Sequence, residues 1–114
     1  MKISEITIAG TKYPVVFNLQ TMLSYEEVSG ASFFAGTDTL KARIALIIAA
    51  ALSADEKTAL TVEKITGAGD LAAVREITAA YKAVNELAAE FFELPAVEKQ
   101  AEIPAAAEED KGKN

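Results

Sequence analysis

Three groups of residues have types and spacings that could support chemistry, and the first is a glycine-rich turn. Residues 67–72 match the G-x-G-x-x-A pattern of dinucleotide-binding turns, and Glu86 and Glu90 follow near the spacing of a ribose-binding acid. That pattern requires a buried parallel strand before the turn and another strand after its helix. Glu63 and Lys64 precede the turn instead, and no apolar strand follows. We therefore interpret 67–72 as a linker ahead of a helix cap.

The second group is a row of carboxylates. Glu86, Glu90 and Glu93 recur along one helical face, where their oxygens could gather a hard cation. The Glu-x-x-His motif of di-iron bundles is excluded because the sequence contains no histidine. Lys82 stands four residues before Glu86, in position for an ion pair. We interpret this face as solvated helix surface and expect no metal.

The third group, the serines, has nothing to activate it. Ser24, Ser29 and Ser32 are candidate nucleophiles, but the absence of histidine removes the commonest general base. Cysteine and tryptophan are absent as well, so the chain has neither disulfides nor thiolate metal sites. No set of residues supports catalysis, and we expect neither an enzyme nor a bound cofactor.

Length and charge restrict the remaining classes of protein. A chain of 114 residues has room for one domain. Its net charge is −6, and it lacks a run of Lys or Arg that would neutralise phosphates, so nucleic acid is not an expected partner. No apolar stretch approaches the roughly 20 residues of a membrane span, and no signal peptide is evident. We expect no membrane association and a cytoplasmic protein.

The first thirty residues predict a β-hairpin followed by a helix. The hairpin is expected over 3–17, with Gly10 supplying the tight turn within 9–12. The helix is expected over about 19–29, because Asn18 can cap its free N–H groups and Gly30 can close it. Its apolar stripe is formed by Leu19, Met22 and Leu23, opposite Glu26 and Glu27.

A second helix is predicted over 38–52, with Thr37 or Asp38 as its cap. All nine residues from 44 to 52 are apolar, so this helix must be covered on every side. In so small a domain one face could be left for another protein. The alternative is a central core helix, and the sequence leaves both interpretations open.

Two more helices and a tail complete the prediction. A short helix over 61–66 begins at Thr61, and a long one over 70–94 begins at Asp70. The apolar residues of the long helix recur at three- and four-residue steps: Leu71, Val74, Ile77, Tyr81, Val84, Leu87, Phe91 and Leu94. Pro95 follows, and 95–114 is expected to be a disordered acidic tail.

The predicted fold class is therefore α+β, mainly α, with an N-terminal hairpin packed on a bundle of three to four helices in one domain over 1–94. Two aromatic pairs, 33–34 and 91–92, could contribute a partner-binding patch. Adjacent residues on a helix cannot point the same way, so one of Phe91 and Phe92 should be at least half exposed. The candidate partner-binding residues are Phe33, Phe34, Ile44, Ile47, Ile48, Leu52 and Phe92.

Several of these features resemble the tail assembly chaperones of long-tailed, siphovirus-like bacteriophages and prophages. Such proteins often open with an Ile-x-Ile-x-Gly-x-x-Tyr-x-x-x-Phe hairpin, which residues 6–17 match. They continue with a helix ending in Leu-Glu-Glu-x-x-Gly, and 25–30 reads Tyr-Glu-Glu-Val-Ser-Gly here. A second helix with a small-residue apolar run resembles 47–52. The resemblance covers about residues 3–93.

The resemblance implies a role without catalysis. A tail assembly chaperone coats the long, apolar tape-measure protein, keeps it soluble and helps recruit tail-tube subunits in the host bacterial cytoplasm. Self-association is a further expectation. An acidic surface suits that role because it supplies solubility, and exposed aromatic residues would hold helical client segments. The alternative is a small non-enzymatic virion adaptor or an acidic regulator that binds one protein.

Overall fold

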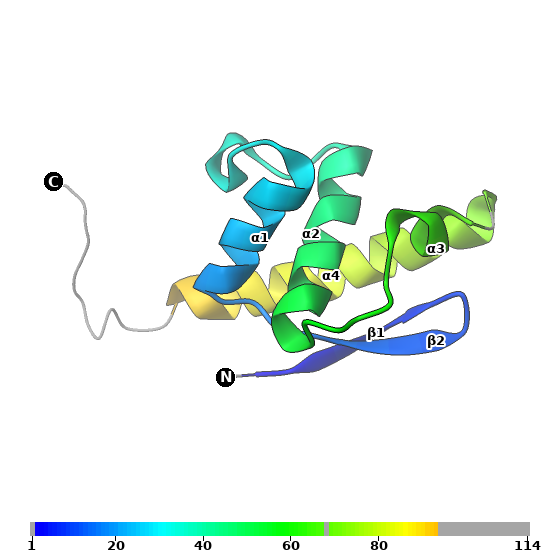
Figure 1. Ribbon diagram of the computed structural model, residues 1–114, viewed down its shortest axis with the longest axis horizontal. Coiled ribbons are helices and arrows are strands. Elements are labelled where there is room, and N and C mark those ends of the chain that lie inside the picture. The colour runs from blue at the N-terminus through cyan, green and yellow to red at the C-terminus, as the bar shows by residue number, and fades with distance from the viewer. Residues whose placement is uncertain (1, 68, 94–114) are drawn as a thin grey trace, which may run out of the picture.

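A computed structural model of the protein describes residues 2–67 and 69–93. The expected tail, 95–114, and the predicted helix end at Leu94 lie outside the described residues. Within them the predicted α+β, mainly α, class is confirmed (Figure 1). The elements run in the order β1 (Ser4–Ile8), β2 (Thr11–Val15), α1 (Leu19–Ser29), the 3-10 turn η1 (Phe33–Ala35), α2 (Leu40–Ala54), α3 (Val62–Thr66) and α4 (Leu71–Glu93).

The hairpin is tighter than expected. Its strands pair antiparallel with Ile8 opposite Thr11, so only Ala9 and Gly10 form the turn, rather than the four residues 9–12. Both turn residues have positive φ, 52° and 83°, as a type I′ turn requires. Gly10 meets this need without strain, whereas Ala9 has a Cβ in the left-handed region. The inward face of the hairpin supplies four core residues: Ile6, Ile8, Tyr13 and Val15.

Helix α2 is the centre of the core. It contacts α1, α3, α4 and strand β2, and α4 also contacts β1 (Figure 1). Every residue from Ile44 to Ala51 is buried, and Ile47 is 0% exposed. Of the two interpretations of the apolar run, the central core helix is therefore the one that the structure shows. Burial of apolar surface of this kind is the dominant favourable term in folding.

The predicted helix caps are correct with one exception. The Asn18 side chain accepts from the Thr21 N–H at 3.0 Å, and Gly30 ends α1 at φ 75°. The Thr61 hydroxyl accepts from Lys64, and Asp70 accepts from Ala73. The exception is α2, which is capped by Thr39 and not by Thr37 or Asp38. Thr37 instead bonds to Tyr81 on α4, and Asp38 pairs with Arg43 of α2 itself.

Two predicted apolar stripes are only partly buried. Helix α1 buries Thr21, Met22, Ser24 and Tyr25, while Leu19 and Leu23 face solvent. Polar Thr21 is tolerated inside because its hydroxyl donates to the Val16 carbonyl at 3.1 Å.

The first turn of α4 behaves similarly. Leu71 and Val74 are exposed, and the buried face of the helix begins at Ala73 and Ile77. This end of α4 extends beyond α2 and lies beside the short helix α3 (Figure 1).

Candidate protein-binding surface

Five phenylalanines from three separate segments meet in one cluster. Phe17, which precedes α1, is buried at its centre. Its ring centroid lies 5.7 Å from that of Phe33, 5.4 Å from Phe91 and 5.7 Å from Phe92. Phe34 packs edge-on against Phe33 at 5.6 Å. We call Phe33, Phe34, Phe91 and Phe92 the aromatic surface, because they pack on Phe17 directly or, for Phe34, through Phe33, and are exposed to different degrees.

Local structure holds η1, which carries two of these rings, against α1. The Ser32 hydroxyl accepts from the Phe34 N–H at 3.2 Å, and the Glu26 carboxylate accepts from the Phe33 N–H at 3.1 Å. The Phe33 ring also meets the buried Tyr25 ring edge-on, 5.8 Å between centroids. These contacts fix a short segment whose own three residues include no buried side chain.

Exposure divides the aromatic surface into anchors and free rings. Phe33 and Phe91 are partly buried, while Phe34 is 77% exposed and Phe92 is 53% exposed. The prediction that one ring of the 91–92 pair is at least half exposed is confirmed. Exposed aromatic rings indicate a candidate contact surface, because burying a fully exposed Phe side chain would contribute about 2 kcal/mol of favourable free energy.

The seven predicted partner-binding residues do not form one site. Phe33, Phe34 and Phe92 come together, and the Phe33 and Phe92 rings stack with centroids 6.3 Å apart. Ile44, Ile47, Ile48 and Leu52 do not join them on the outside. The first three are buried, and Leu52 is partly buried against the core, so the apolar run 44–52 leaves no exposed face for a partner. Sequence reasoning overlooked Leu19 and Leu23, two exposed residues one turn apart on α1.

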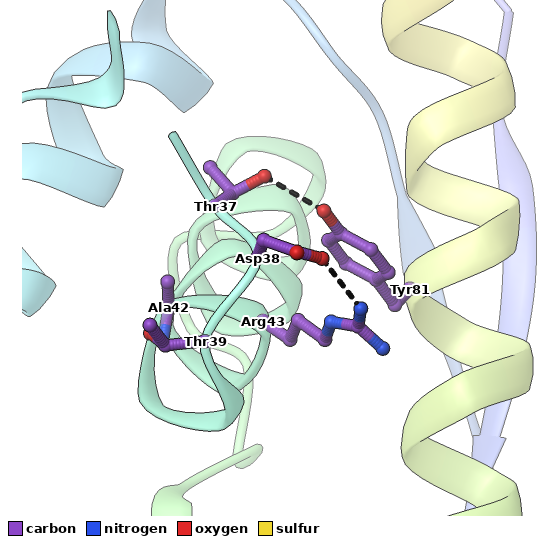
Figure 2. Close-up of polar contacts among 6 residues, drawn as sticks. All are labelled: Thr37, Asp38, Thr39, Ala42, Arg43 and Tyr81. Carbon is purple, nitrogen blue, oxygen red and sulfur yellow. Dashed lines mark hydrogen bonds and ion pairs between the residues drawn. The ribbon is translucent and has the colours of Figure 1, made fainter. Parts of the chain in front are cut away.

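A polar cluster joins the loop before α2 to α4 (Figure 2). The Thr37 and Tyr81 hydroxyls are hydrogen bonded at 2.8 Å. The Arg43 guanidinium donates to Asp38 at 2.7 Å and lies over the Tyr81 ring, 4.6 Å from its centroid. The charges of Arg43 and Asp38 are paired, although the buried Arg43 Nε has no hydrogen-bond partner among the described residues, and the cluster fastens the segment that follows η1, so we interpret it as structural support.

A groove separates strand β1 from α4. It has a volume of about 400 Å³ and is lined by residues 5–7 of the strand and, from the helix, by Arg75, Glu76, Ala79, Ala80 and Ala83. At its end the Glu76 carboxylate accepts a hydrogen bond from the Ala9 N–H at 3.0 Å. The alanines keep the groove open because none of them reaches the strand edge.

The row of glutamates on α4, whose spacing could have supported cation binding, instead contributes an ion pair with the N-terminal segment. Glu90 pairs with Lys2 at 2.9 Å, which ties the start of the chain to the end of α4. That hydrogen bond, together with the negative charges of Glu90 and Glu86, raises the pKa of the exposed Lys2 ammonium above its usual value. Within residues 2–67 and 69–93, no three metal-ligating side chains gather around one point.

None of the helices in the described part of the chain combines the length and apolar character needed to cross a membrane. Comparison of the whole chain with protein-family models, with curated proteins and with solved structures finds no match. The aromatic surface, the polar cluster and the groove therefore have to be interpreted from their own geometry.

Proposed function

We propose that this protein is a phage tail assembly chaperone, which binds apolar helical segments of the tape-measure protein through its aromatic surface and keeps them soluble. The observation that carries the proposal is the pair of exposed rings, with Phe92 packed on the buried Phe17 and Phe34 packed on Phe33. The hairpin and helix motifs that resemble that family support it. The role involves no catalysis and belongs to the host bacterial cytoplasm.

The arrangement of the rings suits a helical client. Rings held by a packed aromatic core lose little side-chain entropy when a partner covers them, so their burial contributes most of its free energy to binding. An amphipathic client helix presents apolar side chains at three- and four-residue steps, which exposed rings can interleave. Leu19 and Leu23 add apolar area on α1, the helix against which η1 packs.

Charge supports the same role. The net charge of −6 keeps complexes of many chaperone copies on one long client from associating with each other. A tail-tube subunit is the second partner in the proposed role, recruited to the client once it is coated. Chaperone copies would leave as the tube assembles.

The test is co-expression with a tape-measure protein, which we expect to be encoded beside this gene. We expect the client to move from the insoluble to the soluble fraction and to co-purify with the chaperone. The double variant Phe34→Ser/Phe92→Ser should lose at least about tenfold in affinity, equivalent to 1.4 kcal/mol. The matched control is Leu71→Ser/Val74→Ser, which removes two exposed apolar side chains, 61% and 52% exposed, from the other end of the described α4.

The outcomes distinguish a failure of the proposed function from a failure of the proposed binding surface. A client that stays insoluble with the unaltered chaperone would overturn the proposed function. A client rescued equally by the phenylalanine variant, or lost equally with the control variant, would show that binding does not use the aromatic surface.

A further inference from the structure

We propose that the groove between β1 and α4 is a second binding site, which takes an extended peptide segment of a partner protein as an added β-strand. The proposal is independent of the aromatic surface and of the chaperone role. It begins from the main-chain groups at the free edge of β1.

The register of the hairpin shows which residues present these groups. In an antiparallel pair, residues that exchange hydrogen bonds across the ladder alternate with residues whose N–H and C=O point outward. The two-residue turn makes Ile8 and Thr11 a bonded pair, so Glu5 and Thr7 belong to the outward-pointing set. Pro14, which has no N–H to donate, lies opposite Glu5, as expected for a pair that does not exchange bonds.

The two edges of the hairpin are treated differently. On β2, Pro14 cannot donate outward and the Val16 N–H next along is bonded to the Ala50 carbonyl at 3.3 Å, so of the outward residues on that strand Lys12 keeps its N–H. On β1, Glu5 and Thr7 both line the groove, and although α4 packs against this strand, none of the described residues makes a main-chain hydrogen bond to their outward groups. Proteins commonly satisfy or block the outward groups of strand edges, so an edge whose outward groups stay unbonded beside a groove indicates a place for a further strand.

The groove walls favour one kind of occupant. Glu5 and Thr7 together present two N–H and two C=O groups at the spacing of a β-strand. An extended peptide backbone carries complementary groups at this spacing, whereas a helix does not. The alanine floor, Ala79, Ala80 and Ala83, leaves room for small or β-branched side chains on one face of that peptide. Glu5 and Glu76 outnumber Arg75 along the rim, so lysine-bearing segments are favoured over acidic ones.

At one end of the groove, a side chain already binds a main-chain group of the hairpin. Glu76 binds the Ala9 N–H, a main-chain donor beyond the last ladder pair. It therefore closes one end of the edge and limits an added strand to the stretch beside Glu5 and Thr7. An occupant of about four to six residues fits that stretch at 3.3 Å per residue.

The experiment uses the full-length chain labelled with nitrogen-15 and a short peptide, KVTVTK, acetylated and amidated at its ends. We expect saturable shifts of the Glu5 and Thr7 amide signals. A peptide of the same sequence with alternate N-methylated residues, which cannot donate to the edge, should bind at least about tenfold more weakly. Ala79→Trp, which fills the groove, should weaken binding similarly. Ala89→Trp is the matched control, because Ala89 is exposed on α4 and does not line the groove.

A second variant guards against misfolding of Ala79→Trp. Thr7→Pro removes one outward N–H and leaves the ladder bonds of Ile6 and Ile8 in place. It should therefore also weaken binding of the peptide. The proposal is overturned if the two amides do not shift, if the N-methylated peptide binds equally, or if Ala79→Trp and Ala89→Trp bind alike. It is also overturned if the shifts fall at Phe34 and Phe92, or if sedimentation shows a second copy of the chain occupying the edge.

Discussion

The guanidinium of Arg43 lies over the ring of Tyr81, with 4.6 Å between its central carbon and the ring centroid. Through this contact and the Thr37 hydroxyl, α4 holds the segment that joins η1 to α2 (Figure 2). The relationship matters for function because η1 carries Phe33 and Phe34. A loop fastened at both ends presents its rings in one arrangement.

Removal of either hydroxyl should loosen this connection. Tyr81→Phe keeps the ring beneath Arg43 but loses the 2.8 Å hydrogen bond to Thr37, and Thr37→Val loses the same bond from the other side. Each should lower the free energy of unfolding by about 1 kcal/mol in urea denaturation. The double variant should be little worse than either single one, because both remove one interaction. Fully additive losses would contradict this pairing.

The burial of α2 gives a sharp contrast along one helix. Ile47→Ala should lower the free energy of unfolding by about 2–5 kcal/mol, because this side chain is 0% exposed and its loss leaves a cavity. Leu40→Ala, at a position 61% exposed on the same helix, should change it by less than about 0.5 kcal/mol. A negligible loss for Ile47→Ala would mean that this face is open in solution.

The hairpin turn can be improved. Ala9 has a φ of 52°, a conformation that costs an ordinary L residue about 1–2 kcal/mol and costs Gly or Asn less. Ala9→Asn should therefore raise the melting temperature, with a gain of about 0.5–1 kcal/mol. Ala9→Val, which is β-branched, should lower it. Equal melting temperatures for all three chains would show that the turn adopts another conformation.

The pairing of Lys2 with Glu90 predicts a pH effect of known sign. The pair raises the pKa of Lys2 in the folded protein, chiefly through the hydrogen bond. Its contribution to stability is therefore complete below the usual lysine pKa and is lost as pH rises through the folded-state value. Glu90→Gln should lower the pKa of Lys2 toward its usual value in a titration followed by NMR. An unchanged titration would mean that the two side chains do not pair in solution.

Local signals in the sequence determined the order and limits of the elements. Asn18 and Gly30 bound α1, Thr61 begins α3 and Asp70 begins α4, because a cap depends on side chains within a few residues of the helix end. Thr39 displaced the predicted cap of α2 for a tertiary reason. Thr37 and Asp38, the predicted caps, instead bond to Tyr81 and Arg43.

Which apolar residues face solvent was decided only by the tertiary structure. The composition of α2 was equally compatible with a core helix and with a helix that binds another protein through an apolar face. Contact with α1, α4 and β2 places it in the core. Leu19 and Leu23 match the helical period as well as Met22 does, yet only Met22 is buried. Periodicity places residues on a common face, but burial depends on elements distant in sequence. The aromatic surface and the β1–α4 groove exist for the same reason, since each forms only when segments some 60 or more residues apart pack together.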